Sequence, residues 1–352
     1  MKYHLISGGC GFVGRNMVKR LFKTTEDRII FIDNLLVGTH PSDWLSAEKS
    51  GDIGDMEVFG EDKRLYFIKD DFRNLLQKMT ADDRYIQNTY GLEFDKFSDV
   101  FHFAAIVGGR AVIDGDPMMV AQDLAIDAEF FYWICRHKPA RALYPSSSAA
   151  YPVNLQTESH SIALSESDID FNNMGQPDMT YGWSKLTGEY LAKIASEYYG
   201  VSVLCIRPFS GYGEDQDLTY PIPAIAQRVA RREEPMTVWG TGKQGRDFVH
   251  IEDVMDCIFL AMDHITDGSA INIGMGRLTS FLEIIDVLTD IAGYKPEIKC
   301  LLDKPVGVHS RYSNMDYVSN KLGWKAKISM EEGMKRMYEA ALERERKAAK
   351  TE

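Results

Sequence analysis

A tyrosine and a lysine four residues apart, Tyr181 and Lys185, form the pair in this sequence best suited to acid–base chemistry. On a helix this spacing places both side chains on one face. A phenol normally titrates near ~10 and is a poor base at neutral pH. A neighbouring ammonium favours the phenolate and lowers that pKa. We therefore predict that Tyr181 takes a proton from a hydroxyl group and that Lys185 lowers the pKa of its phenol.

A serine cluster, Ser146-Ser147-Ser148, follows an apolar run over 142–145 that predicts a buried strand. A serine at such a strand end can share a hydrogen bond with the phenol and orient a substrate. The alternative is that Tyr181 and Lys185 are an ordinary pair on a surface helix, because their spacing is common by chance. The presence of a strand-end serine cluster and of a dinucleotide-binding pattern earlier in the chain favours catalysis.

That earlier pattern is a glycine-rich turn in which Gly8, Gly11 and Gly14 follow an apolar run and open a helical pattern. In a dinucleotide-binding turn, the first glycine permits a tight bend, the second lets the backbone approach a pyrophosphate, and the third lets helix and strand pack closely. The N–H groups of the first helical turn, which contains Phe12 and Val13, would face the phosphates.

Asp33 ends the second apolar run, 29–32, about 20 residues after the turn, and Asn34 follows it. An aspartate in this place accepts hydrogen bonds from a ribose and repels a 2′-phosphate, so NAD is predicted rather than NADP. The positive nicotinamide ring would also favour the Tyr181 phenolate. A hydroxyl proton could then go to Tyr181 while a hydride leaves the same carbon.

Strand-like and helical patterns alternate along the first 212 residues, which predicts an α/β fold with a doubly wound parallel Rossmann sheet. We predict an NAD-binding domain over 1–212 plus 246–275 and a smaller C-terminal substrate-binding domain over 213–245 plus 276–352. A helix is expected over 118–136 and an exposed, charged helix over 331–350. The polar segment 38–62 is either a cover for the cofactor or a surface insertion.

Composition narrows the classes of partner. The formal net charge of −12 disfavours nucleic acid and anionic membranes. No apolar stretch approaches the roughly 20 residues of a membrane span, and the first residues do not resemble a secretory leader. The five cysteines are scattered, without metal-like spacing, which predicts reduced thiols, a cytoplasmic location and no metal site.

Nearly from end to end, the sequence resembles the extended short-chain dehydrogenase/reductase family, the nucleotide-sugar epimerases and dehydratases. The resemblance implies a nucleotide-diphosphate sugar as substrate and a homodimer formed through the helices near 118–136 and 181–199. It rests on the glycine turn, Asp33-Asn34-Leu35, Asp71-Phe72-Arg73, Phe101-His102-Phe103-Ala104-Ala105, the serine cluster, Tyr181 with Lys185, Arg207-Pro208-Phe209, Tyr212-Gly213, Arg246-Asp247-Phe248-Val249-His250 and Leu322-Gly323-Trp324.

The resemblance also implies roles for individual residues. The catalytic set would be Ser147, Tyr181 and Lys185, with Ser147 preferred over Ser148 because the family places its serine four before an aromatic, here Tyr151. Arg246 and Arg311 would grip the substrate diphosphate as guanidinium forks, or else form surface ion pairs. The implied cofactor-binding residues also include Asp71, Phe72, Ala104, Ala105 and Pro208, and the implied substrate-binding residues also include Gly108, Gly109, Ser148 and Ser210.

Within the family, the chain is similar to the GDP-mannose 3,5-epimerases but departs from their acid–base pair. Ala149 stands where that subgroup has a cysteine, and Pro221 stands where it has a lysine. Neither side chain can carry a proton, so epimerisation at carbons 3 and 5 is predicted to be lost. Ser148 and Ala149 also replace the Asp-Glu pair of the dehydratases. Two further departures, Ser210 for asparagine and Glu214 for proline, affect the expected sugar site.

Oxidation at carbon 4 of the sugar is the chemistry that remains. The first hypothesis is an NAD-dependent epimerase of a GDP-mannose- or GDP-heptose-like sugar that acts by transient oxidation at carbon 4. The alternatives are a 4-dehydrogenase that releases the keto sugar, the same reaction run backwards as a reductase, and a non-catalytic NAD-binding regulator. A regulator would typically lack Tyr181 or Lys185, and both are present.

Overall fold

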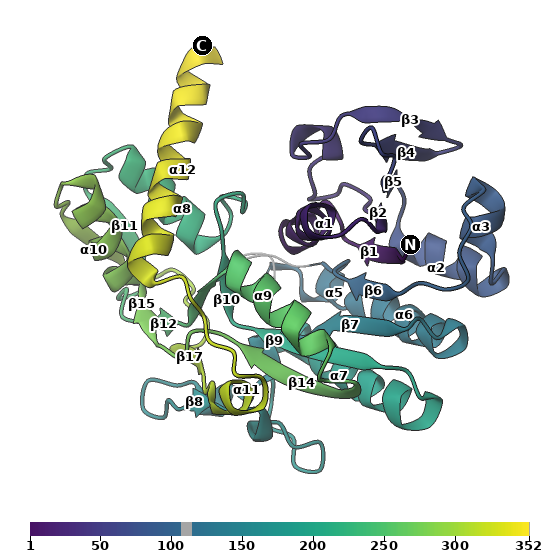
Figure 1. Cartoon of the computed structure of the whole chain (residues 1–352). Coiled ribbons are helices and arrows are strands. Elements are labelled where there is room, and N and C mark those ends of the chain that lie inside the picture. Colours follow the sequence, from purple (N-terminus) through teal and green to yellow (C-terminus); the bar gives the residue numbers. More distant parts are fainter. Residues whose placement is uncertain (107–114, 352) are drawn as a thin grey trace.

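A large, mostly parallel sheet forms the centre of the fold (Figure 1). The computed structural model describes residues 1–106 and 115–351. The sheet has nine strands in the order β14-β9-β7-β6-β1-β2-β5-β4-β3, and neighbours are parallel from β14 to β5. The strands are β1 Tyr3–Ser7, β2 Arg28–Ile32, β3 Lys49–Ile53, β4 Met56–Phe59, β5 Leu65–Ile68, β6 Asp99–His102, β7 Arg141–Pro145, β9 Val203–Pro208 and β14 Asp267–Ile273.

Helices cover both faces of this sheet, which confirms the doubly wound α/β architecture. Because both faces are buried, β2 and β5 are apolar along most of their length rather than alternating. One apolar core contains residues of α1 Phe12–Thr24, α9 Ile251–Met262 and α11 Asp316–Leu322. The other contains residues of α2 Phe72–Ala81, α3 Tyr85–Tyr90, α6 Asp123–His137 and α7 Met179–Tyr199.

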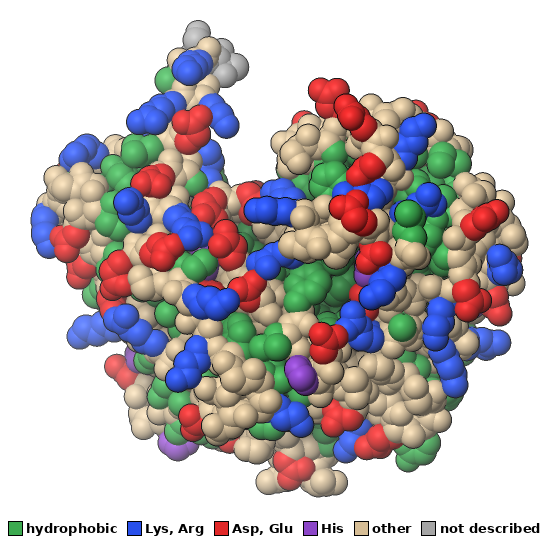
Figure 2. Space-filling view, viewed as in Figure 1, with side chains coloured by type: hydrophobic (Ala, Val, Ile, Leu, Met, Phe, Trp, Pro, Cys, Tyr) green, Lys and Arg blue, Asp and Glu red, His purple; other side chains and the backbone are tan. Residues whose placement is uncertain are grey.

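The C-terminal part has its own apolar core, built mainly by α8 Pro221–Ala230, α10 Phe281–Ala292 and α12 Met330–Thr351. A notch separates α12 from the part of the molecule that carries β3 and β4, and Lys and Arg side chains lie at its floor (Figure 2). The remaining strands form small sheets: β10 Ser210–Tyr212 with β13 Phe248–His250, β11 Met236–Trp239 with β16 Ile298–Leu301, and β15 Thr279–Ser280, β12 Gly245–Arg246, β17 Ser310–Ser313 and β8 Ala163–Leu164 together.

Short helices complete the described elements. The 3₁₀ turns are η1 Pro41–Asp43, η2 Ser148–Ala150, η3 Val153–Leu155 and η4 Glu166–Asp168, and α5 is Pro117–Val120. Within the part of the chain that the structure describes, no helix is both long and apolar enough to cross a membrane. All five cysteines are free thiols.

Three segments have structure that the prediction did not describe. The polar segment 38–62 contains the β3–β4 hairpin, which extends the sheet at its edge. The helix expected over 118–136 is interrupted between α5 and α6, where the N–H groups of Gln122 and Leu124 bond carbonyls three residues back. The C-terminal helix was predicted to be exposed, but Met330, Met334 and Met337 are buried and only its last turns project (Figure 1).

Candidate active site

The glycine turn connects β1 to α1 in a conformation that larger residues cannot take. Gly8 has a φ of +65°, and a Cβ there would lie 2.6 Å from the Phe103 carbonyl carbon. A Cβ at Gly14 would lie 2.0 Å from the Gly8 carbonyl oxygen. Gly11 caps α1 without a side chain, and a Cβ there would meet only the Gly8 oxygen at 3.4 Å. The N-terminus of α1 is thus left open to a phosphate group.

Asp33 lies at the end of β2 and is bound to the same turn. Its Oδ2 accepts the Cys10 N–H at 2.9 Å, and its Oδ1 accepts the Leu35 N–H at 2.8 Å. Burial raises the pKa of Asp33 above its ordinary value, although these N–H groups oppose the change. Each carboxylate oxygen has a second lone pair for a ribose hydroxyl. The glycine turn, the open helix end and Asp33 therefore fit NAD.

The other implied cofactor residues are placed less uniformly. The Ala104 N–H donates to the Ser7 hydroxyl at 3.2 Å, and Ala105 follows it, half-buried. Asp71 caps α2 by accepting the Arg73 N–H at 2.9 Å. The Phe72 ring packs in the core against His102, with ring centroids 5.4 Å apart, so the ring itself is not open to a bound cofactor. Asn34 is exposed, and Pro208 ends β9 half-buried.

Tyr181, Lys185 and Ser147 lie together at the first turns of α7. The Lys185 Nζ is 5.7 Å from the centroid of the Tyr181 ring. Ser147 lies near enough to Tyr181 to lower the pKa of its phenol. The Ser147 Oγ also accepts the Ala149 N–H at 3.1 Å, which fixes the serine at the start of η2. The structure therefore brings the three predicted catalytic residues into one group.

The pKa of the Tyr181 phenol differs from the sequence prediction. Burial raises it above the ordinary value, and this effect outweighs Lys185 and Ser147, which both lower it. The lysine acts in the predicted direction, but the predicted net decrease is wrong for the chain by itself. Two buried carboxylates, Asp123 and Asp127, add to the increase.

Those carboxylates belong to a buried polar network behind Lys185 that the sequence analysis missed. Asp127 accepts the Tyr144 hydroxyl at 2.6 Å and bonds the His102 Nε2 at 3.1 Å. The His102 Nδ1 lies 2.8 Å from the Ser7 hydroxyl, which already accepts the Ala104 N–H. The ionised Asp127 carboxylate can only accept, so Nε2 donates to it, and Nδ1 of the neutral ring then accepts from Ser7. The i, i+4 spacing of two aspartates in a largely apolar helical segment could have revealed the network.

Arg246 and Arg311 lie side by side on the parallel strands β12 and β17. Arg246 donates to the carbonyls of Gly245 at 2.7 Å and Val306 at 3.2 Å. Arg311 donates to Asp178 at 2.8 Å and also to Gln156, and its ion pair with Asp178 is largely buried. The ion pair of Arg311 therefore lies inside the fold rather than on the surface.

The residues predicted to contact the sugar are placed in part. Ser148 is buried in η2, and Ser210 is half-buried at the start of β10. Ala149, in the place of the subgroup's cysteine, is buried, and Pro221 begins α8. Gly108 and Gly109 lie outside the described residues. Tyr220, which the sequence analysis missed, lies within electrostatic reach of Tyr181, and burial raises its pKa to about 12.

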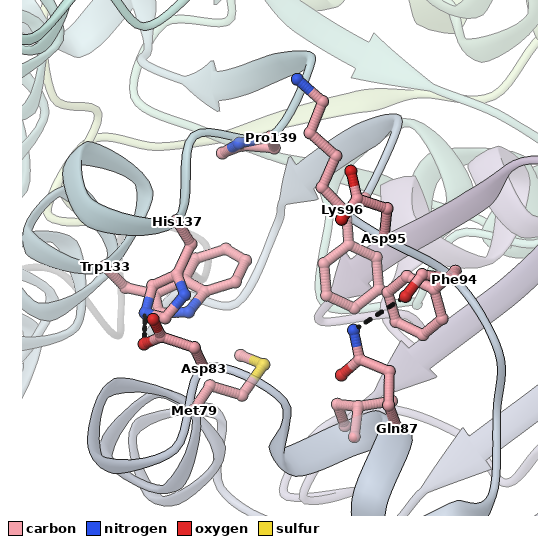
Figure 3. A pocket seen from close by; sticks show the side chains of 11 residues that line it. Met79, Asp83, Gln87, Phe94, Asp95, Lys96, Trp133, His137 and Pro139 are labelled. Atoms are coloured by element: carbon pink, nitrogen blue, oxygen red, sulfur yellow. Dashed lines mark hydrogen bonds and ion pairs between the residues drawn. The ribbon is translucent and has the colours of Figure 1, made fainter.

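A separate small pocket lies at the other end of α6, beside α2 and α3 (Figure 3). It has a volume of about 50 Å³, and Met79, Trp133 and His137 are among its lining residues. This volume holds one or two water molecules and is far too small for a nucleotide sugar. Among the described residues, no cluster of His, Cys, Asp and Glu could hold a metal ion.

The fold, the glycine turn and the Tyr–Lys pair define an enzyme of the Rossmann type that uses NAD. The chain belongs to the NAD dependent epimerase/dehydratase family, whose model matches residues 4–274. A putative UDP-glucose 4-epimerase of Methanocaldococcus jannaschii is 26% identical over 95% of this chain and 96% of its own length. A GDP-L-fucose synthase of Sinorhizobium fredii is 25% identical over 74% of this chain and 86% of its own length.

A solved structure also matches the whole fold. The UDP-glucose 4-epimerase of Thermotoga maritima, solved with UDP-glucose, has a TM-score of 0.77 and is 23% identical. The match covers 98% of this chain and 99% of that one. This match supports the fold, while the family model confirms the resemblance to the epimerases and dehydratases.

Proposed function

We propose that this chain is an NAD-dependent nucleotide-sugar epimerase that acts by transient oxidation at carbon 4 of the sugar. The observation that carries the proposal is the grouping of Ser147, Tyr181 and Lys185 on the fold that carries the glycine turn. NAD, when bound, supplies the hydride acceptor. The 4-epimerase named among the relatives supports the position of oxidation.

Each member of the group has a defined task. Ser147 hydrogen-bonds the phenol and the sugar hydroxyl, which aligns the proton with its acceptor. Tyr181 takes that proton as general base. It returns the proton after the keto sugar has rotated and is reduced on its other face. Lys185 stabilises the phenolate by its positive charge. Burial keeps water away from the proton path.

For the substrate we propose a GDP-mannose- or GDP-heptose-like sugar, with Arg246 and Arg311 holding the diphosphate. Their neighbouring positions on β12 and β17 support a shared anionic ligand. The relative named as a GDP-L-fucose synthase supports guanine as the nucleotide base, whereas the 4-epimerase relatives are named for UDP-glucose. We assign substrate binding to 213–245 and 276–352, cofactor binding to 1–212 and 246–275, and the protein to the cytoplasm.

We further propose a homodimer formed through α6 and α7. These helices pack together and expose Tyr132, Trp183 and Tyr190, whose exposed fractions are 55%, 42% and 49%. Exposed aromatic side chains on neighbouring helices are typical of an interface core. Sedimentation should show a dimer, and Trp183→Glu should give a monomer, whereas Tyr199→Glu, past this stripe, should not. A monomeric wild type would contradict the proposal.

The reaction is tested with GDP- and UDP-sugars in heavy water, followed by mass spectrometry and chromatography of the sugars. A 4-epimer of unchanged mass is expected. A loss of two daltons would identify a net 4-dehydrogenase. Deuterium at carbon 3 or 5 would show that 3,5-epimerisation occurs, against the expectation from Ala149 and Pro221. No change with any sugar nucleotide would overturn the proposal.

Tyr181→Phe should reduce turnover by on the order of 10³-fold, because the proton acceptor is lost. Thermal stabilisation by NAD should persist in this variant. Tyr198→Phe, on the exposed side of the same helix, is the matched control and should leave turnover unchanged. Near-normal turnover of Tyr181→Phe would remove the phenol as the base.

A further inference from the structure

The two aspartates behind Lys185 are equally buried but differently bonded. Asp123 and Asp127 lie one helical turn apart on α6, which packs against α7. Both are at most 1% exposed, and Lys185 on α7 is 2% exposed. The structure thus places two acidic groups and one basic group in a region where water cannot screen them.

Asp127 is fixed as a carboxylate. Although burial raises its pKa, Lys185 and the hydrogen bonds from His102 and Tyr144 bring it below the ordinary value. Both of its oxygens are used, one by each of those side chains. Asp127 therefore supplies a constant negative charge.

Asp123 is not fixed in this way. Its Oδ1 accepts the Ile106 N–H at 2.6 Å, and its Oδ2 has no hydrogen-bond partner among the described residues. Burial raises the pKa of Asp123 to about 6, with Lys185 and the Ile106 N–H opposing and Asp127 contributing to the increase. A buried carboxylate oxygen without a partner is costly and therefore calls for an explanation, of which a functional role is one.

The same groups face Tyr181. Lys185 lowers the pKa of the phenol, whereas Asp123 and Asp127 raise it. In the other direction, Asp127, Tyr181 and Asp123 each stabilise the ammonium of Lys185. When both carboxylates are charged, they outnumber the lysine, and the phenolate would be a third negative charge beside it.

We propose that Asp123 is a positioning residue for the Tyr181–Lys185 pair: its carboxylate competes with the phenolate for the ammonium of Lys185 and so sets the pH at which Tyr181 can act as a base. When Asp123 is protonated, only Asp127 and the phenolate of Tyr181 compete for the ammonium of Lys185. The proposal rests on the proposed function of Tyr181, and the tests below separate the two.

The first test is an ultraviolet titration of tyrosinate in the NAD-loaded enzyme, with Tyr181→Phe identifying the transition of residue 181. Asp123→Asn keeps the shape and the oxygen that accepts the Ile106 N–H. It should lower the Tyr181 midpoint by about one pH unit, the usual effect of removing one nearby like charge. The acid limb of kcat/KM should move by the same amount.

Asp116→Asn is the matched control. Asp116 is exposed and likewise accepts a backbone N–H, that of Met119 at 2.9 Å. This variant should leave the Tyr181 midpoint and the acid limb unchanged. An unshifted midpoint in Asp123→Asn would overturn the inference while leaving Tyr181 as the base. Near-normal turnover of Tyr181→Phe would instead overturn the proposed function.

A second measurement holds even if Asp123→Asn fails to fold. Infrared difference spectra of the wild type should show a buried carboxylic acid that titrates near pH 6. In Lys185→Met its midpoint should rise by about one unit, because the opposing charge is gone. A titration that does not respond to Lys185→Met would show that Asp123 and Lys185 do not interact, and would contradict the proposal.

Discussion

Successive turns of α7 hold buried charges in two different ways. At Lys185, the cation faces two carboxylates, and one oxygen of Asp123 has no described partner. At Glu189, both oxygens bind the Arg207 guanidinium, at 2.8 and 2.7 Å, and Ser146 donates to one of them. Arg207 also donates to the Tyr151 hydroxyl at 3.0 Å.

The difference separates a structural network from a reactive one. The Glu189–Arg207 pair is saturated with hydrogen bonds, so neither partner can change charge without a large penalty. The Lys185 group is equally buried but retains an unused acceptor, which lets one member gain or lose a proton near neutral pH. The two groups are equally buried. The Glu189–Arg207 pair is held in one geometry, whereas the group around Lys185 contains a carboxyl whose pKa is raised toward neutrality.

The saturated pair should show the largest effect on stability. Arg207→Met leaves Glu189 as an uncompensated buried charge and should reduce the free energy of unfolding by about 3–5 kcal/mol. Urea denaturation measures this loss. Arg231→Met, which breaks an exposed pair with Glu345, is the control and should cost under about 1 kcal/mol. A cost that small for Arg207→Met would show that the two turns do not differ as described.

Removing the charge of Asp123, in the group around Lys185, should instead increase the free energy of unfolding. The folded-state pKa of Asp123, about 6, lies above the ordinary 3.8, so the folded state binds the proton more tightly than the unfolded state. Its charged form therefore destabilises the fold at pH 7, and this cost fades as the pH falls through 6 toward 4. Asp123→Asn should stabilise the protein by about 3 kcal/mol at pH 7 and by only about 0.5 kcal/mol at pH 4.

Denaturant unfolding of wild type and Asp123→Asn at both pH values checks the sign. If the variant were less stable than the wild type at pH 7, the carboxylate would be a net stabiliser, and the contrast between the two turns would disappear.

Lys185→Met tests the catalytic side of the comparison. Turnover should fall by on the order of 10²-fold, because the phenolate loses its stabilising charge. Steady-state kinetics with the sugar nucleotide that reacts in the heavy-water assay measure the loss, and it should appear in kcat more than in KM. The basic residue at Lys193, two turns further along α7, is the control position, and Lys193→Met should retain full activity.

The smallest effect on stability is expected at the exposed ion pair that Lys193 forms further along α7. Lys193 and Glu197 are half-exposed and 3.7 Å apart at i, i+4 spacing. Glu197→Gln should change the free energy of unfolding by under about 0.5 kcal/mol. A change of several kcal/mol would mean that charge pairing along α7 matters regardless of burial, which would weaken the comparison.

The sequence predicted the parts of the fold that depend on local pattern. The glycine turn, the parallel strands and the helix that carries Tyr181 and Lys185 all follow from spacing and apolar periodicity. The break between α5 and α6 and the β3–β4 hairpin depend on turn geometry that the apolar pattern does not encode. The buried face of α12 was missed although Met330, Met334 and Met337 lie at helical spacing, because the charged residues between them dominate the composition.

The site was predicted as a set of residues but not as an electrostatic environment. Ser147, Tyr181 and Lys185 could be named from their types and order. The net direction of the phenol pKa could not, because it depends on burial and on Asp123 and Asp127, which tertiary packing brings to α7. The core position of the Phe72 ring likewise depends on a distant contact with His102.

Ser7 connects the glycine turn to the polar network behind Lys185. It is the last residue of β1 and directly precedes Gly8. Its hydroxyl receives the N–H of Ala104 and reaches Asp127 through His102. One hydroxyl thus joins the residues beside the glycine turn to the buried carboxylate of Asp127. A substitution of Ser7 would therefore remove hydrogen bonds on both sides of this junction at once.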